Sequence, residues 1–236
     1  MATQSHTQPE KKEGFFSRYL DPIWRLSEMI YGILIVMTFT LAFRSIDANT
    51  INAEMASGEA VRRMFLAAMG CTIAWGFIDG VMYIMTSLFE RANSQRLVRT
   101  IQTAPDKQAA IAAIQDEMDE ELSVVDEADR QVLYHTLYEG LRDVELKRTG
   151  VIRDDVMGAI AVALIAFVAV LPVAVPFLFI PDPVAAIRAS NLIAVVMLFL
   201  IGYRWAKYVN ANPWKIGALL AGVAVVIVLI AIPLGG

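Results

Sequence analysis

Cysteine and histidine are nearly absent from this 236-residue sequence, which contains one cysteine, Cys71, and two histidines. A single cysteine excludes a disulfide framework and any zinc or iron–sulfur site built from several cysteines. The phosphate-binding patterns GxxxxGK[ST] and GxGxxG are also absent. The long apolar stretches contain neither a histidine nor a Gly-x-Ser-x-Gly, so they lack the groups that an intramembrane hydrolase needs. We therefore expect that the protein is not an enzyme.

Charged residues are scarce as well: they make up 19% of the chain, and the formal net charge is −4. Such a mildly acidic chain has no general affinity for nucleic acid. Hydrophobic residues reach 57%, against about 45–50% in a soluble domain, and the mean hydropathy is +0.53. Because this apolar excess is concentrated in a few long runs, the sequence predicts an integral membrane protein surrounded by membrane lipid.

Five runs are long enough to cross the membrane as helices, which takes roughly 20 mostly apolar residues. The predicted spans of this all-α membrane protein are Trp24–Phe43, Met64–Leu88, Val156–Phe179, Ile187–Trp205 and Ile216–Leu234. Residues 1–21 form a polar tail without the apolar core of a cleaved signal peptide. The predicted domains are this tail, spans one and two in 22–90, an acidic helical insert in 91–155, and spans three to five in 156–236.

Basic residues near the span ends predict the orientation of the chain, because cytoplasmic loops are enriched in Lys and Arg. One side carries most of them: Lys11, Lys12, Arg18, Arg25, Arg91, Arg96, Arg99, Lys147, Arg148, Arg153, Arg204, Lys207 and Lys215. The other side carries Arg44, Arg62, Arg63 and Arg188. We expect a cytoplasmic N-terminus and insert, and a C-terminus outside.

Proline and small residues predict how the third span is shaped and packed. Pro172 and Pro176 lie late in this span and are expected to bend it, since each removes a backbone hydrogen bond. Small residues let helices approach closely, and we interpret them here as packing surfaces. They are Gly158, Ala159, Ala161 and Ala163 in span three and Gly217, Ala221 and Gly222 in span five.

The polar interval between spans two and three is strongly acidic, with 14 acidic and 6 basic residues from Thr103 to Asp155, a local net charge of −8. It predicts two or three amphipathic helices. An apolar stripe in Ala109–Met118, with Pro105 in the opening turn, indicates the first. Apolar residues recurring from Val132 to Val144 indicate a second helix that ends near Gly150.

Two acidic patterns in this insert are candidate metal ligands. Glu117, Glu120 and Glu121 are spaced to share one helical face, and oxygen ligands of this kind suit divalent cations. His135 and Glu139 form a second pair one turn apart. Either pattern can equally be a solvated helix face, although the crowded acids repel one another and need an offsetting cation or basic surface.

Ionisable residues inside the spans are the strongest functional indication, since a charge at the bilayer centre costs at least about 2.5–3.5 kcal/mol. Asp79 lies in the middle of span two, and Glu28 lies near the start of span one. Met82 and Met85 follow in span two, and Glu90 lies just beyond its cytoplasmic end. We interpret these five residues as candidate metal or proton ligands. The alternatives are a hydrogen-bonded polar anchor for Asp79, an ion pair with Arg25 for Glu28, and simple packing for the methionines.

Three segments resemble the vacuolar iron transporter family. They are SEMIYGILIVMTFT in span one, DGVMYIMTSLFERANSQR at the end of span two, and DDVMGAIAVALIAFVAVLPVAVPF in span three. The resemblance covers nearly the whole chain from Glu28. It implies a bacterial-type relative in the inner membrane, a homodimer, and a metal pathway that exchanges cytoplasmic Fe²⁺ or Mn²⁺ for protons. By position it assigns Glu28, Asp79 and Met82 or Met85 to the pathway, and Glu117, Glu120 and Glu121 to metal collection.

One departure from the family lies in span one, where the family has a second aspartate, in an Asp-Gly pair seven residues after the first acid. This chain has Ile35 followed by Val36 there. The pathway then relies on Asp79, carries another substrate, or carries none. We expect a transporter of Fe²⁺ or Mn²⁺ with no further cofactor. The alternative is a non-transporting membrane protein whose insert senses metal or binds a basic partner.

Overall fold

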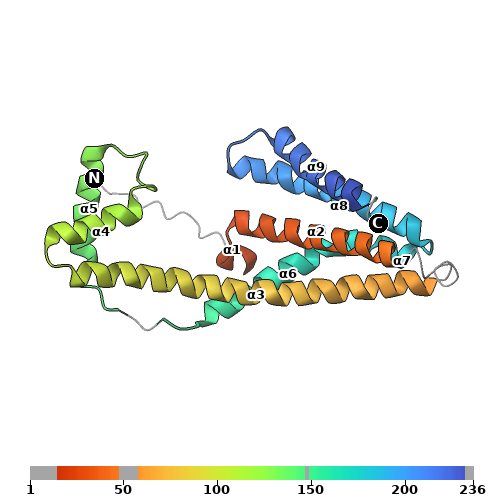
Figure 1. Ribbon diagram of the computed structural model, residues 1–236, viewed down its shortest axis with the longest axis horizontal. Coiled ribbons are helices and arrows are strands. Elements are labelled where there is room, and N and C mark those ends of the chain that lie inside the picture. The colour runs from red at the N-terminus through yellow and green to blue at the C-terminus, as the bar shows by residue number, and fades with distance from the viewer. Residues whose placement is uncertain (1–14, 48–57, 147–148, 232–236) are drawn as a thin grey trace, which may run out of the picture. The chain divides into compact units, whose positions relative to one another are not determined.

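The computed structural model describes residues 15–47, 58–146 and 149–231. Most of the predicted polar tail and the last residues of the fifth predicted span lie outside them. Within these ranges the chain is helical and contains no strand (Figure 1). The helices are Phe15–Tyr19 (α1), Pro22–Asp47 (α2), Gly58–Thr103 (α3), Lys107–Met118 (α4), Glu127–Leu141 (α5), Arg153–Ala174 (α6), Pro176–Phe179 (α7), Pro183–Tyr208 (α8) and Pro213–Ala231 (α9).

Five of these helices are long and apolar enough to span a membrane, and they confirm the all-α class with five candidate spans in the described part of the chain. They are α2, α3, α6, α8 and α9. The second of these five helices, α3, is far longer than the predicted span Met64–Leu88. With 46 residues, α3 measures about 69 Å at a rise of about 1.5 Å per residue, whereas the hydrocarbon core is about 30 Å thick. The residues after Leu88 therefore continue the same helix to Thr103.

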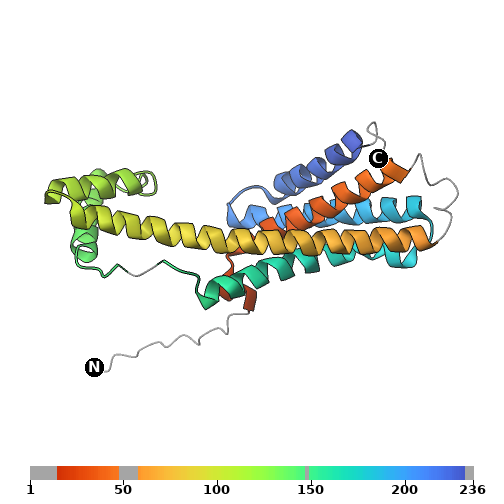
Figure 2. The same cartoon turned by 60° about the horizontal axis from the view of Figure 1, so that its bottom comes forward.

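The chain divides into two compact units, one made of the residues up to Tyr83 and from Val156 onward, the other of Ile84–Asp155. In the first unit, α8 and α9 lie side by side and α2 packs against both (Figures 1 and 2). The core between the long helices consists of buried aliphatic side chains and Met37, including Ile33, Val36, Ala68, Val170, Ala194, Leu198 and Ala224. Apolar side chains outside this core are widely exposed, as expected of helices that face lipid.

The small residues of the third span do pack against other helices. A Cβ added to Gly76 of α3 would lie 3.4 Å from the Cα of Ala163 in α6, and one on Gly80 would lie 3.2 Å from the carbonyl oxygen of Ala159. Gly32 of α2 approaches the same helix, 3.1 Å from the carbonyl oxygen of Ala166 by the same measure. These glycines let α2 and α3 contact α6 at backbone distance.

The third predicted span consists of two helices with an interruption between them. Pro172 lies inside α6, which continues to Ala174. The interruption comes at Val175, after which Pro176 opens the short helix α7. Proline is tolerated at a first helical position because it has no N–H to leave unpaired there. Pro176 accordingly begins α7, whereas α6 continues past Pro172.

The 84–155 unit contains the end of α3 together with α4 and α5. Asp106 caps α4 by accepting a hydrogen bond from the Ala109 N–H at 2.8 Å. The helix therefore begins at Lys107, two residues after Pro105. The expected end of the second helix near Gly150 is wrong: α5 ends at Leu141, which leaves Val144 outside it. The unit has its own apolar core of Ile101, Ala110, Ile111, Ile114 and Tyr134.

Candidate functional site

Glu28 of α2 is buried inside the apolar bundle, with 4% of its surface exposed. Its Oε2 atom has no hydrogen-bond partner. The ion pair with Arg25 is not formed between these two described residues, because Arg25 donates from Nη1 to the hydroxyl of Ser17 at 3.3 Å. A buried polar atom without a partner is rare and costly in proteins, and Glu28 has the one carboxylate oxygen of this kind among the described residues.

Asp79 of α3 is the acid whose negative charge acts on the carboxyl group of Glu28. Packing explains the proximity. Glu28 lies one turn before Gly32 and Asp79 one residue before Gly80, and both glycines contact α6. Met29 and Tyr83 also pack against one cluster that includes Val162 of α6. The two carboxyl groups therefore lie at a similar level of the bundle.

Two neighbouring carboxylates among apolar helices, one of them with an unpartnered oxygen atom, can hold a proton or coordinate a cation. They do not make a complete metal site within one chain. Among the described residues, no three His, Cys, Asp or Glu side chains come close enough to hold a metal ion together. Further ligands must come from water, other side chains or a second copy of the chain.

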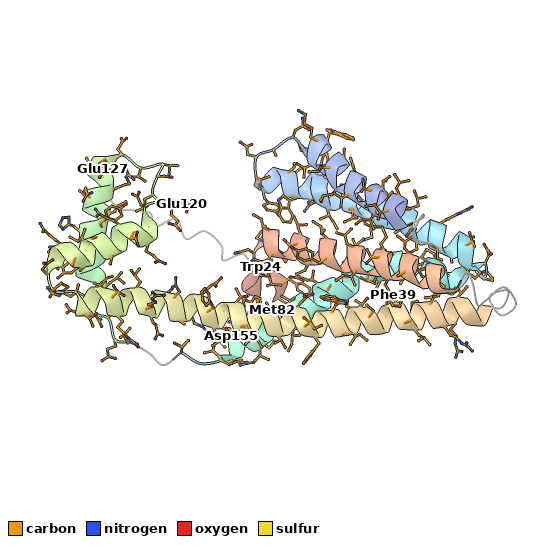
Figure 3. The ribbon with its side chains drawn as sticks, in the orientation of Figure 1. Trp24, Phe39, Met82, Glu120, Glu127 and Asp155 are labelled. Atoms are coloured by element: carbon orange, nitrogen blue, oxygen red, sulfur yellow. The ribbon has the colours of Figure 1, made fainter. Side chains whose placement is uncertain are left out.

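Met82 and Met85 of α3 lie on the surface of the helix rather than in the core. Met82, marked in Figure 3, is 54% exposed and Met85 is 58% exposed. Tyr83 lies on the same stretch of helix but turns inward. Its hydroxyl donates to the carbonyl oxygen of Tyr19 at 3.0 Å, and its ring lies edge-on to Trp24 at 6.3 Å. Met82 and Met85 thus remain accessible to a partner outside the single chain, whereas Tyr83 is used for packing.

The three glutamates of the 84–155 unit do not share one helical face. The helix α4 ends at Met118, so Glu120 and Glu121 lie in the following turn while Glu117 lies on the helix. Glu117 accepts a hydrogen bond from Asn93 Nδ2 at 2.9 Å. The expected common face is therefore wrong, because the helical repeat stops one residue after Glu117. Glu90 is exposed on α3.

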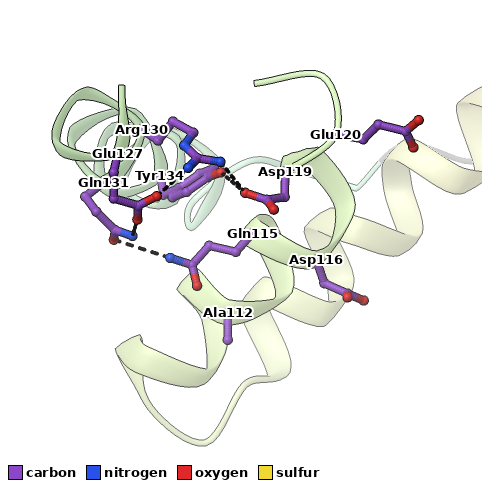
Figure 4. Close-up of a pocket in the computed structure, with 9 residues that line it drawn as sticks. All are labelled: Ala112, Gln115, Asp116, Asp119, Glu120, Glu127, Arg130, Gln131 and Tyr134. Carbon is purple, nitrogen blue, oxygen red and sulfur yellow. Dashed lines mark hydrogen bonds and ion pairs between the residues drawn. The ribbon is translucent and has the colours of Figure 1, made fainter. Parts of the chain in front are cut away.

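A pocket between α4 and α5 gathers other acids of this unit (Figure 4). Its lining residues are Ala112, Gln115, Asp116, Asp119, Glu120, Glu127, Arg130, Gln131 and Tyr134. Arg130 pairs with Asp119 at 2.8 Å and with Glu127. Tyr134 donates to the same Asp119 oxygen at 3.2 Å. Burial and this hydrogen bond to a carboxylate raise the pKa of Tyr134. Arg130 supplies the positive charge that the sequence pattern required.

His135 and Glu139 share one face of α5 and line a second shallow pocket with Gln131, Val132 and Thr136. Glu139 is already engaged, since it accepts a hydrogen bond from Lys107 Nζ at 2.8 Å. That hydrogen bond lowers the pKa of Glu139 below its ordinary value. The Lys107 ammonium also lies 5.1 Å from the centre of the Tyr138 ring. Glu139 therefore serves to join α4 to α5.

One pair that sequence reasoning missed is Arg91 and Asp155. Arg91 of α3 donates to Asp155 Oδ2 at 2.5 Å, and the same oxygen accepts a hydrogen bond from the Ile152 N–H at 2.9 Å. Asp155 is 5% exposed. The two residues are 64 positions apart, so no local pattern could connect them. An acid in the first turn of a helix was the one available signal.

No family model and no curated protein sequence matches this chain. Its function is therefore inferred from its own side chains, above all from Glu28 and Asp79.

Proposed function

We propose that the protein is a membrane transporter of divalent metal, Fe²⁺ or Mn²⁺, that moves the metal out of the cytoplasm in exchange for protons and acts as a homodimer. The proposal rests on one observation. Glu28, buried and with an unpartnered carboxylate oxygen, lies within electrostatic range of Asp79 inside an apolar helix bundle. The resemblance of spans one to three to the vacuolar iron transporter family supports the same proposal.

A buried acid, Glu28, beside a second acid that is half-buried, Asp79, is costly as a purely structural feature. Each loses hydration in the bundle, and their like charges repel. A divalent cation relieves both costs at once, and so do protons when the cation has left. Exchange of metal for protons follows from this, because the same oxygen atoms serve both cargoes.

A second copy of the chain would complete the ligand set. Ile35 stands where the resembling family has its second span-one acid, so each chain offers the pair Glu28 and Asp79 alone. Two chains together provide four carboxylates, and the exposed Met82 and Met85 are accessible at such an interface. Acids in the 84–155 unit would gather the metal on the cytoplasmic side.

Flux in proteoliposomes tests this proposal. We expect Mn²⁺-dependent proton movement by the unaltered chain and at least tenfold slower movement in Asp79→Asn, which keeps the side-chain shape but loses the charge. Asp129→Asn is the matched control, since Asp129 is exposed in the first turn of α5. Undiminished flux in Asp79→Asn, with the protein correctly folded, would reject the pathway through this acid.

A non-transporting metal sensor is the second candidate, and the pocket of Figure 4 favours it. Asp116 and Glu120 are exposed at this pocket, whereas Asp119 and Glu127 are paired with Arg130. Titration of Mn²⁺ onto the full chain, combined with the flux assay, separates the two candidates. Binding that is lost in Asp116→Asn with Glu120→Gln, without any flux, supports the sensor.

A further inference from the structure

The last part of the chain contains no acidic residue after Asp182. The helices α8 and α9 therefore have no carboxylate side chain, and they carry four cationic side chains. Arg188 lies near the start of α8, whereas Arg204 and Lys207 lie within about one turn of its end and Lys215 is the third residue of α9. Three cations therefore gather where α8 turns into α9. All three are exposed, and no ion pair between described residues involves them.

Aromatic side chains surround these cations. The ring of Tyr203 lies 5.7 Å from that of Trp214 in an edge-on arrangement, and Phe199 lies 5.8 Å from Trp214. Lys207 Nζ lies 5.2 Å from the centre of the Tyr203 ring. Trp214 is 68% exposed and Tyr208 is 50% exposed. Amphipathic rings at the end of an apolar helix are typical of the level of the lipid headgroups.

Close backbone packing makes this end of the hairpin rigid. A Cβ on Gly202 of α8 would lie 2.8 Å from the carbonyl oxygen of Ile216 in α9, and one on Gly217 would lie 2.9 Å from the Phe199 ring. The connecting turn is held by Asn212, whose Oδ1 accepts hydrogen bonds from the backbone N–H groups of Trp214 and Lys215 at 3.0 and 3.3 Å. The backbone N–H groups of the turn are therefore occupied by Asn212. Only the cationic side chains are left to bind an anion.

We propose that this basic aromatic end, made of Arg204, Lys207, Tyr208, Trp214 and Lys215, binds the headgroups of anionic phospholipids. The lipid phosphate supplies the negative charge that α8 and α9 lack, while Trp214 and Tyr208 lie among the headgroups. Each Lys or Arg near an anionic membrane surface adds to the attraction between the protein and that surface. An acidic protein would match the charge alone, whereas phospholipid also matches the exposed rings at the end of apolar helices.

Thermal unfolding of the full chain in nanodiscs tests the proposal. The nanodiscs contain phosphatidylcholine alone or phosphatidylcholine with one third phosphatidylglycerol. We expect phosphatidylglycerol to raise the unfolding midpoint of the unaltered chain by several degrees. The triple variant Arg204→Gln, Lys207→Gln, Lys215→Gln should lose most of this shift. Arg188→Gln, which removes an exposed cation of the same acid-free region at the other end of α8, should keep it.

Several outcomes would overturn the proposal. One is equal unfolding midpoints of the unaltered chain in the two lipids. A second is an undiminished shift in the triple variant. A third is an equal shift from soluble glycerol phosphate or polyglutamate added to phosphatidylcholine discs, which would indicate a general anion or acidic protein site. If the triple variant does not fold, the salt dependence of the unaltered chain decides: a phosphatidylglycerol shift that survives 500 mM NaCl would contradict headgroup binding, and one that is lost supports it.

Discussion

The negative charge of Asp79 acts on the buried carboxyl group of Glu28 inside an apolar helix bundle, and one oxygen atom of Glu28 has no hydrogen-bond partner. Neither acid has a cation partner among the ion pairs of the described residues. The bundle holds the pair because glycines on α2 and α3 allow close contact with α6.

Replacing Glu28 by glutamine should stabilise the metal-free protein. The amide keeps the shape of the side chain and removes a negative charge that is buried beside Asp79 and has lost its hydration in the bundle. The unfolding midpoint in nanodiscs without metal should therefore rise. Asp129→Asn, an exposed change, should shift stability by less than about 0.5 kcal/mol. A lower midpoint for Glu28→Gln would show that the carboxylate has a stabilising partner.

The contact between α3 and α6 should depend on Gly80. A valine there must displace the backbone of Ala159, because even its Cβ would lie 3.2 Å from that carbonyl oxygen, and overpacking of this kind costs about 1–3 kcal/mol. Gly70 of the same helix has no heavy atom within 4 Å of such a Cβ. Gly70→Val is therefore the matched control, with the same change in helix propensity. Equal losses of stability in both variants would contradict close packing at Gly80.

The salt bridge between Arg91 and Asp155 should be important for stability, because Asp155 is buried and also accepts the Ile152 N–H. Asp155→Ala should cost about 1–3 kcal/mol, because it leaves the Ile152 N–H and the partly exposed Arg91 without their acceptor. The exposed neighbour Asp154 provides the control, and Asp154→Ala should change stability little. A double-mutant cycle with Arg91→Ala measures the pairing directly. A coupling energy near zero would show that the two side chains act independently.

The sequence predicted the elements that depend on local patterns. Long apolar runs located the five candidate spans, and the apolar stripe of Ala109–Met118 located α4. Patterns could not show that α3 continues beyond the apolar run to Thr103. Polar residues such as Asn93 and Gln95 end the hydrophobic run, although they are compatible with a helix. They also could not show where α4 ends, which separates Glu117 from Glu120.

The candidate site was predictable only in part. A lone aspartate amid apolar residues identified Asp79 without any structure. A sequence pattern cannot show that Glu28 is buried, lacks a hydrogen bond and lies near Asp79. These properties depend on contacts between residues of α2, α3 and α6, which are far apart in the sequence. The pairs Arg91 with Asp155 and Lys107 with Glu139 are hidden for the same reason.

The carboxyl group of Glu139 should titrate below its ordinary range because the Lys107 ammonium donates to it. A lowered pKa in the folded state means that this contact stabilises the protein above the ordinary pKa of a glutamate and is lost as the pH falls through the lowered value. An NMR titration of the full chain in micelles measures the value. Lys107→Gln should raise the pKa of Glu139, whereas an unchanged value would show that the contact is absent in solution.

Anomalous scattering from crystals of the full chain grown with Mn²⁺ tests the central claim most directly. The account predicts a manganese peak within coordination distance of Glu28 and Asp79, which disappears in Asp79→Asn while the helix bundle stays intact. Manganese bound at the pocket of Asp116 and Glu120 alone, with no peak at the acid pair, would contradict transport through these two carboxylates.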